Sequence, residues 1–355
     1  MTVRQVLERG ADMGIGVLGT GSYLPAETVS NSLVAERAGV TDEWIVRKTG
    51  IRSRRYAAED EATSDLAVAA AEAALRDAGI GAHEVAWIVV ATSTPDHPQP
   101  ATACLVQHRI GAHRAAAFDV NSVCSGFVFA LEAAARLLSP SRVPGPGSPV
   151  GPGYALVIGA DVYSRIIDPS DRRTAVLFGD GAGAVVLGPV GPDRGLVGSR
   201  LASHGDRHDL IYVEAGGSRA PASEKTVAAG RHFFQMKGRA VSEFVAEELP
   251  RAVREVLDAH GVDPSGVDHF IPHQANGVML RDTFPALGLP RARLHLTVDE
   301  HANTSAASIP LALDSGRRAG AFEDGDLLLL AGFGGGMSVG TALVRWDGSG
   351  GSGRP

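Results

Sequence analysis

The sequence predicts an α/β fold made of two related halves, and two patterns support this prediction. Short apolar, β-branched runs alternate with segments of helical spacing along most of the chain, which is typical of folds with buried sheets. Two pairs of segments also resemble each other: 70–92 with 252–274, and 178–188 with 332–344. Their separation, on the order of 160–180 residues, indicates a duplicated domain rather than a solenoid.

The expected boundaries follow from this repeat. One half spans residues 13–190 and the other spans residues 191–347, so the join lies near residue 190. Residues 1–12 resemble a loosely attached helical arm, and the Gly/Ser-rich tail at 348–355 is typical of a flexible end.

Individual elements are predicted from local patterns. Residues 64–80 have helical spacing and a glycine stop near their end, and residues 126–138 form a second expected helix. Strands are expected at short apolar runs bounded by turn residues, namely 86–93, 116–120 and 154–160.

The composition narrows the class of protein. A net charge of −7 without a Lys/Arg run argues against a nucleic-acid partner, and no apolar run is long enough to cross a bilayer. The first residues carry charges of both signs and lack the apolar core of a secretory signal. Only two cysteines occur, Cys104 and Cys124, so we expect no disulfide framework and a cytoplasmic location.

Cys124 is the first candidate for chemistry. It lies where an expected strand ends, the chain turns and a helix begins, in FDVNSVCSGFVFALEAA. A thiol at a helix N-terminus has its thiolate stabilised by unpaired N–H groups, so we expect a lowered pKa. The alternative is a buried structural cysteine, and this is the expectation for Cys104, which lies within a helix.

Three further segments could contribute polar groups. His273 follows a strand, where it could face a cleft, although many histidines are merely solvated or hydrogen-bonded. Asn303 lies in a small, polar loop before a helix and could be a simple cap. The glycines at 332–336 could form a tight turn, or bring a backbone N–H to a developing oxyanion.

Two glycine patterns have the residue spacing of a dinucleotide-binding motif but lack its structural context. Gly14, Gly16 and Gly19 are followed by a proline-containing stretch, so no helix N-terminus is available for a pyrophosphate. The glycines at 179–183 lie between two strands rather than between a strand and a helix. No Cys/His cluster has metal-ligand spacing, so no metal is expected.

Taken together and in order, the motifs closely resemble those of the β-ketoacyl-acyl-carrier-protein synthase III family of the thiolase superfamily. The resemblance covers residues 14–346 and rests on seven blocks: DEWIVRKTGIRSR (42–54), FDVNSVCSGF (118–127), DPSDRRT (168–174), FGDGAGA (178–184), PHQAN (272–276), HANTSAAS (301–308) and GFGGG (332–336). It implies a thiolase-like fold, with two duplicated αβαβα halves in five layers, and a homodimer.

The resemblance also implies the roles of individual residues. Cys124 would be the nucleophile, with His273 and Asn303 completing the catalytic set. The backbone N–H groups of Cys124 and Gly335 would form the oxyanion hole. The remaining positions concern substrate binding: Trp44, Arg172 and Lys48 for CoA, and Gln99 at the gate of the acyl pocket.

The expected reaction loads an acyl group from acyl-CoA onto Cys124 and condenses it with a malonyl thioester, which loses CO₂. Residues of this type suit that chemistry, because a neutral imidazole and an amide can donate hydrogen bonds to an enolate oxygen. The malonyl group would be carried by CoA or by a carrier protein, in a fatty-acid or polyketide pathway. CoA thioesters are substrates here, and no cofactor is implied.

The sequence departs from the family pattern at several positions. Those before the nucleophile, usually small, are Asn121, Ser122 and Val123, and Gln99 replaces the usual aromatic gate. Positions that usually carry basic charges for carrier-protein docking are Val278, Glu243, Pro285 and Ala286. Since acidic carrier proteins are steered by basic patches, we expect a CoA thioester to be preferred, unless Arg239, Arg254 or Arg281 supplies a shifted patch.

Three alternative functions remain to be compared. A synthase-III-like acyltransferase would pass the acyl group to a hydroxyl or amine, with no enolate for His273 and Asn303 to stabilise. A papain-like protease uses the same residue order, but its cysteine has aromatic neighbours and usually disulfides. A non-catalytic scaffold would not need Cys124 at all.

Overall fold

The computed structural model describes residues 14–138 and 153–348. The arm expected at residues 1–12, and all but the first residue of the expected flexible tail, lie outside the described residues.

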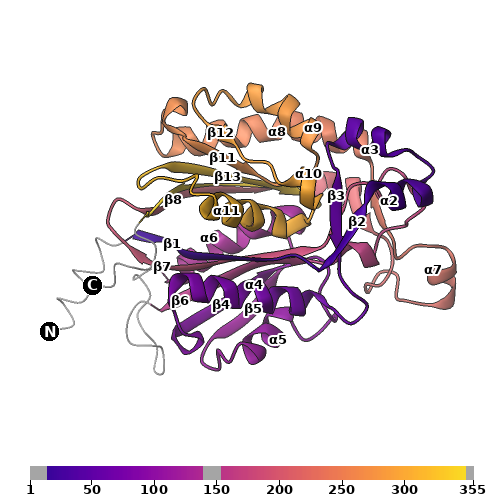
Figure 1. Ribbon diagram of the computed structural model, residues 1–355, viewed down its shortest axis with the longest axis horizontal. Coiled ribbons are helices and arrows are strands. Elements are labelled where there is room, and N and C mark those ends of the chain that lie inside the picture. Colours follow the sequence, from indigo (N-terminus) through magenta and orange to yellow (C-terminus); the bar gives the residue numbers. More distant parts are fainter. Residues whose placement is uncertain (1–13, 139–152, 349–355) are drawn as a thin grey trace.

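Two five-stranded mixed sheets form the framework (Figure 1). The first sheet has the order β1 (Gly14–Tyr23), β7 (Gly181–Val190), β6 (Tyr154–Asp161), β4 (Val85–Ala91) and β5 (Ala116–Val120). The second has the order β12 (Arg293–Leu294), β11 (His269–Pro272), β13 (Leu327–Gly334), β14 (Ser338–Arg345) and β8 (Gly195–Ser203). In each sheet parallel pairs occupy one side and antiparallel pairs the other.

Helices cover both sheets and fill the space between them, which gives five layers (Figure 1). The outer face of the first sheet carries α4 (Thr63–Ala78) and α5 (Thr102–Arg109). The central layer contains α6 (Gly126–Leu138) and α11 (Ser308–Arg318). The outer face of the second sheet carries α8 (Gly238–Ala259), and α9 (Gly277–Thr283) lies nearby. This arrangement confirms the predicted α/β class and thiolase-like fold.

The central helices are buried because apolar and small side chains cover the faces that meet the two sheets. Phe127, Val128 and Leu131 of α6 pack in one cluster with residues of both sheets. Helix α11 approaches the first sheet closely at Gly183, where an added Cβ would lie 2.7 Å from the backbone N of Leu311. Burial on this scale supplies most of the stability of an α/β framework.

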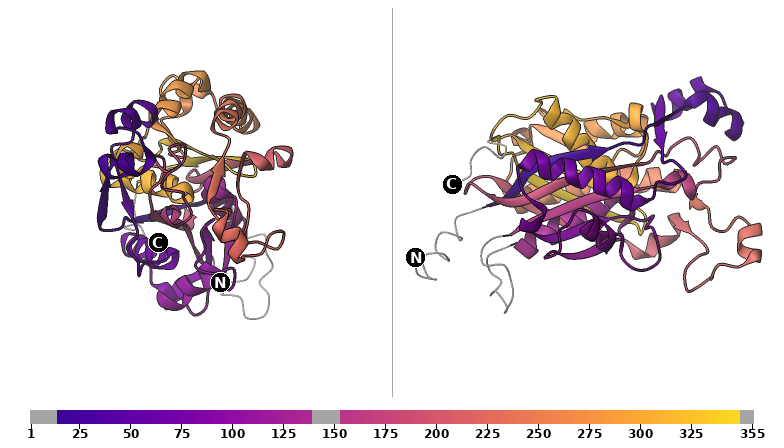
Figure 2. Two further views of the ribbon diagram at one scale, coloured as in Figure 1. Left: turned by 90° about the vertical axis from the view of Figure 1, so that its right-hand side faces the viewer. Right: turned by 60° about the horizontal axis from the view of Figure 1, so that its bottom comes forward.

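Smaller elements gather at one end of the layers (Figures 1 and 2). They include β2 (Glu27–Ser30), α2 (Asn31–Ala38), α3 (Asp42–Thr49), β3 (Ser53–Tyr56), β9 (Ile211–Val213), α7 (Glu224–Ala228), β10 (Phe234–Met236) and α10 (Val298–His301). Short 3₁₀ turns connect many elements, and those that matter below are introduced where they are used. Among the described residues, no helix is long and apolar enough to cross a membrane.

The predicted elements are all present, with small shifts at their ends. The helix expected at 64–80 spans Thr63–Ala78 and stops there because Gly79 adopts a left-handed conformation, with φ of 65°. The strand expected at 86–93 spans Val85–Ala91, because residues from Thr92 onward turn toward the Asp161 carboxylate.

Candidate active site

Cys124 lies at the turn between β5 and α6. A 3₁₀ turn (Val123–Ser125) holds it, and α6 begins at Gly126, as the sequence predicts. The side chain is buried, with 6% of its surface exposed. Val123, directly before it, has a φ of 48°, a conformation that a β-branched residue rarely adopts. The turn therefore holds the sulfur in a fixed, strained position between the two sheets.

A single serine connects Cys124 to the expected catalytic asparagine. The hydroxyl of Ser305 lies 3.5 Å from Sγ of Cys124, and the backbone N–H of Ser305 donates to Oδ1 of Asn303 at 2.9 Å. Because an N–H donor needs an acceptor, the amide oxygen of Asn303 faces Ser305, and the two N–H donors of the same amide point elsewhere. Asn303 thus accepts from the first N–H of the 3₁₀ turn Ser305–Ala307 and keeps its own N–H donors available for a ligand.

His273 joins the same group through a second serine. Nδ1 of His273 lies 2.7 Å from the hydroxyl of Ser308, which also donates to the backbone carbonyl of Ser305 at 2.8 Å. The ring of Phe333 packs edge-on against the imidazole, with 5.1 Å between ring centroids. The structure therefore brings Cys124, Asn303 and His273 together, at the ends of β5 and β11 and before α11.

Burial sets the protonation states at this site. It lowers the pKa of His273 to about 3, opposed by a hydrogen bond to the Ser305 backbone, so the imidazole is neutral. It also raises the pKa of the Cys124 thiol to about 12; the Ser305 hydrogen bond lowers this pKa, and the Asp161 charge raises it. The prediction of a lowered thiol pKa is therefore wrong for the resting protein, because loss of hydration outweighs the helix N-terminus.

The glycine-rich segment contacts the nucleophile directly. It spans the end of β13 and the turn into β14, so it is a tight turn as well as a neighbour of the site. An added Cβ on Gly334 would lie 2.8 Å from the backbone N of Cys124, and one on Gly335 would lie 3.1 Å from the Val123 side chain. The backbone around Gly335 consequently lies close to the expected oxyanion position.

The residues expected to bind CoA lie at the end of the molecule occupied by α2 and α3. Trp44 is half-buried against an apolar cluster that includes Ile45, Tyr163 and Val176. Lys48 and Arg172 are exposed, and the carbonyl of Lys48 accepts a hydrogen bond from Asn276, three residues after His273. Gln99 is exposed on the loop before α5, and no described contact brings it to Cys124 within the chain.

The other motifs considered in the sequence form no such site among the described residues. Cys104 is exposed on α5 rather than buried, so the expectation of a buried structural cysteine is wrong there. Gly14, Gly16 and Gly19 lie in strand β1, as expected for a false dinucleotide match. In the described residues no three His, Cys, Asp or Glu side chains cluster as metal ligands.

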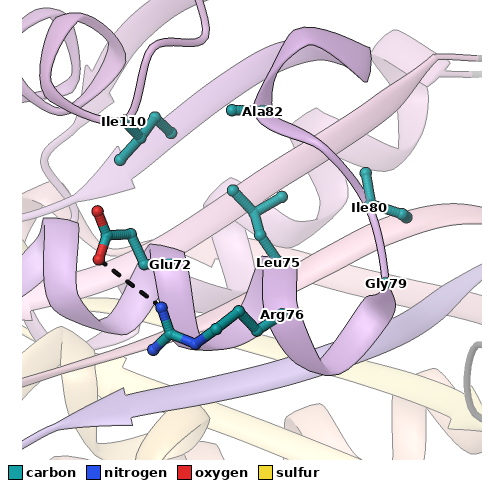
Figure 3. A pocket seen from close by; sticks show the side chains of 7 residues that line it. All are labelled: Glu72, Leu75, Arg76, Gly79, Ile80, Ala82 and Ile110. Carbon is teal, nitrogen blue, oxygen red and sulfur yellow. Dashed lines mark ion pairs between the residues drawn. The ribbon is translucent and has the colours of Figure 1, made fainter.

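A hollow on the outer surface lies away from this site. It is lined by the end of α4 and by Gly79, Ile80, Ala82 and Ile110 (Figure 3). Its charged groups are Glu72 and Arg76, whose ion pair of 3.8 Å is largely exposed. The lining contains no nucleophile and no hydrogen-bonded polar cluster, so the hollow is a surface feature of helix packing.

Sequence reasoning overlooked several site residues. Ser305 and Ser308 lie inside the block HANTSAAS, where they resemble ordinary small residues. Asp161 is fully buried beneath the site. The sequence pattern that could have indicated this is an acidic residue at the end of an apolar strand, YALVIGAD. A carboxylate at the end of a buried strand needs partners, and here they come from residues 92–94 and from Ala306.

The two sheets, the five layers and the buried cysteine between them define an enzyme of the thiolase fold. The matching family models describe 3-oxoacyl-[acyl-carrier-protein] synthase III, at residues 118–205, and the C-terminal part of that enzyme, at residues 257–346. The chain belongs to the β-ketoacyl-[acyl-carrier-protein] synthase III family of acyltransferases.

Individual relatives support this assignment. The acetoacetyl-CoA synthase NphT7 of Streptomyces sp. strain CL190 is 54% identical over 94% of this chain and 99% of its own length. A β-ketoacyl-[acyl-carrier-protein] synthase III of Rhodospirillum centenum is 47% identical over 93% and 98%. Among solved structures, the Aquifex aeolicus synthase III has a TM-score of 0.83 at 35% identity, covering 94% of this chain and 100% of its own. The priming β-ketosynthase of the R1128 polyketide pathway has a TM-score of 0.84 at 33% identity, covering 94% and 96%.

Proposed function

We propose that this chain condenses an acyl group from acyl-CoA with malonyl-CoA, using Cys124 as the acyl-carrying nucleophile. The observation that carries the proposal is the connected group at the site, in which Ser305 links Cys124 to Asn303 and, through Ser308, to His273. The product, a β-ketoacyl-CoA, would prime a fatty-acid or polyketide pathway.

The first half-reaction forms a thioester on the enzyme. The Cys124 thiol gives up its proton to water, the thiolate attacks the acyl carbonyl, and the N–H groups of Cys124 and Gly335 bind the oxyanion. The bond from the carbonyl carbon to the CoA sulfur then breaks. CoA leaves as a thiolate and takes a proton from water.

The second half-reaction forms the carbon–carbon bond. Malonyl-CoA loses CO₂, and the electron pair remains as an enolate whose oxygen is bound by Asn303 and His273. Donation from Nε2 requires Nδ1 to be unprotonated and to accept a hydrogen bond. The Ser308 hydroxyl, which donates to the Ser305 carbonyl in the resting structure, would then turn its one proton to Nδ1. The enolate carbon attacks the acyl group and expels the Cys124 thiolate. Electrons come from decarboxylation, so the reaction uses no metal or redox cofactor.

Surface charge supports malonyl-CoA rather than a malonyl carrier protein. Arg239, one residue that could supply a shifted basic patch, is paired with Glu243 at 2.9 Å on the exposed face of α8. An acidic carrier would meet a neutralised pair at this position. The relative named acetoacetyl-CoA synthase also supports a CoA-bound product.

The test compares the two malonyl donors at equal concentration with one acyl-CoA. We expect kcat/KM to be at least about tenfold higher for malonyl-CoA, and we expect Glu243→Lys to raise turnover of the carrier-bound donor alone. A strong preference of the unmodified enzyme for malonyl carrier protein would contradict the proposal. Release of CO₂ in step with product separates condensation from acyl transfer to a hydroxyl or amine.

Assembly and location complete the proposal. We infer a homodimer, supported by β5, whose outer edge has no partner strand among the described residues and whose apolar side chains are half-exposed. Gln99 lies on the loop that follows β4, next to β5 in the sheet, where a second copy could receive it as an acyl gate.

A cytoplasmic location fits CoA substrates and the free thiol of Cys124, and cell fractionation would test it.

A further inference from the structure

We propose that Ser305 is a further catalytic residue, which supplies the side-chain hydrogen bond to the ionised Cys124 sulfur, and that the neighbouring Asp161 carboxylate competes for the proton of its hydroxyl. This inference rests on the proposed role of Cys124 as the nucleophile.

The Ser305 hydroxyl is the side-chain group that lies against the sulfur. Its oxygen is 3.5 Å from Sγ, and Ser305 has no exposed surface. Across the described residues, no hydrogen bond joins this sulfur to His273 or Asn303, which connect to it only through Ser305 and Ser308.

The backbone of Ser305 is held so that its side chain faces the sulfur. Its N–H donates to Asn303, its carbonyl accepts from Ser308, and its φ is 52°, in the left-handed region that residues other than glycine rarely adopt. Such a conformation persists only where the surrounding contacts fix it. The strained turn therefore places one hydroxyl at the reacting atom.

Asp161 lies beside the turn that carries this hydroxyl. Its carboxylate is fully buried and accepts hydrogen bonds from residues 92–94 and from the N–H of Ala306, at 3.1 Å, next to Ser305 in the chain. Burial raises the pKa of Asp161, and its hydrogen bonds, including one from the Ser305 hydroxyl, oppose that rise. The hydroxyl thus lies among the Cys124 sulfur, the Asp161 carboxylate and the Tyr163 phenol.

A hydroxyl carries one proton, so Ser305 donates to one of these acceptors at a time. While Cys124 is a neutral thiol, the carboxylate is the stronger acceptor. Once the sulfur is ionised, donation to Sγ becomes a charge-assisted hydrogen bond. The other titratable groups that face the sulfur are Tyr163, a neutral phenol, and His273, a neutral imidazole, so Asp161 is the charge that opposes ionisation.

The test is the rate at which iodoacetamide alkylates Cys124 as a function of pH, in the full chain with Cys104→Ala as background. We expect Ser305→Ala to slow alkylation at pH 7 by about 10- to 100-fold and to raise the pH midpoint. Ser125→Ala is the matched control, because Ser125 is equally buried beside Cys124, but its hydroxyl contacts Ser122 and Ser338 instead of the sulfur.

Asp161→Asn should shift the midpoint in the opposite direction. The substitution removes the repelling charge and leaves the Ser305 proton free for the sulfur, so ionisation becomes easier. If the two substitutions acted only by removing buried hydrogen bonds, Ser305→Ala and Asp161→Asn would not shift the pH midpoint of alkylation in opposite directions. If Asp161→Asn does not fold, the comparison of Ser305→Ala with Ser125→Ala decides the proposal.

The outcomes separate this inference from the proposed function, because alkylation needs no CoA substrate. Equal rates for Ser305→Ala and Ser125→Ala would overturn the role of Ser305. A midpoint that rises in Asp161→Asn would overturn the role of Asp161. Absence of acyl transfer from CoA thioesters, with the alkylation profile as expected, would instead contradict the proposed function.

Discussion

At the scale of single residues, backbone strain gathers around the nucleophile. Among the described residues, the non-glycine positions with positive φ are Val123, Ala302 and Ser305, with φ of 48°, 58° and 52°. Val123 directly precedes Cys124, Ala302 directly precedes Asn303, and Ser305 is the residue proposed to contact the sulfur. Each such conformation costs about 1–2 kcal/mol, so the packing of both sheets against this region has to compensate for it.

The neutral state of His273 leads to a prediction about pH. Its pKa of about 3 means that the imidazole neither gains nor loses a proton above about pH 5. We expect malonyl-CoA decarboxylation to show no acid limb near the ordinary histidine pKa. His273→Gln should lower the rate by about 10²–10³-fold without introducing such a limb. A limb near pH 6.5 that disappears in His273→Gln would contradict this state.

What could be predicted for single residues depended on where they lie along the chain. Cys124, His273 and Asn303 lie at the ends of strands or before a helix, and such positions can be inferred from local pattern. The direction in which the Cys124 pKa shifts could not be predicted, because the burial of the thiol depends on how β13 and the turn before α11 pack over the sulfur. The part played by Ser305 depends on a φ of 52°, and no sequence pattern indicates it.

At the scale of elements, glycines let backbones approach the nucleophile. Strand β13 passes so close to the turn of Cys124 that a Cβ on Gly334 would lie 2.8 Å from the Cys124 nitrogen and 2.9 Å from its Cβ. Similarly, a Cβ on Gly159 of β6 would lie 2.2 Å from the carbonyl oxygen of Ala306. The site is therefore formed by four backbone segments in close contact, namely β13, the Cys124 turn, β6 and the turn at Ala306.

A methyl group at Gly334 should push β13 away from Cys124. We expect Gly334→Ala to lower the free energy of unfolding by about 1–3 kcal/mol and to slow acylation of Cys124. Gly217→Ala is the control, since nothing lies within 4 Å of the added Cβ there, and its effect should stay within about 0.5 kcal/mol. Urea unfolding and single-turnover acylation measure the two effects. Equal stability of the two variants would show that the contact is not tight.

The elements themselves were largely predictable. Helix α6 and strand β5 have the expected bounds, because apolar runs and flanking turn residues mark them. The pairing order of the strands was not predictable in detail, since β1 pairs with β7, more than 150 residues away in the chain, through long-range packing. The expected division near residue 190 stays a prediction.

At the scale of the whole molecule, the edge of β5, which has no partner strand in the described part of the chain, predicts association. Unpaired strand edges readily pair with another strand, and the edge next to Gln99 would join two first sheets. We expect sedimentation equilibrium to give twice the chain mass of 36.8 kDa. Phe118→Asp, on β5, should shift the mass toward the monomer, whereas Val227→Asp, on the exposed helix α7, should not. A monomer at micromolar concentration would contradict the proposed homodimer.

The central claim is that Cys124 carries the acyl group, and mass spectrometry of the acylated protein tests it most directly. After incubation with acetyl-CoA, the intact chain should gain one acetyl group, and peptide mapping should place it on Cys124. The added mass should persist in Cys104→Ala, although Cys104 is the more exposed thiol, and should be absent in Cys124→Ala. An acetyl group that remains on the Cys124→Ala variant would contradict the account.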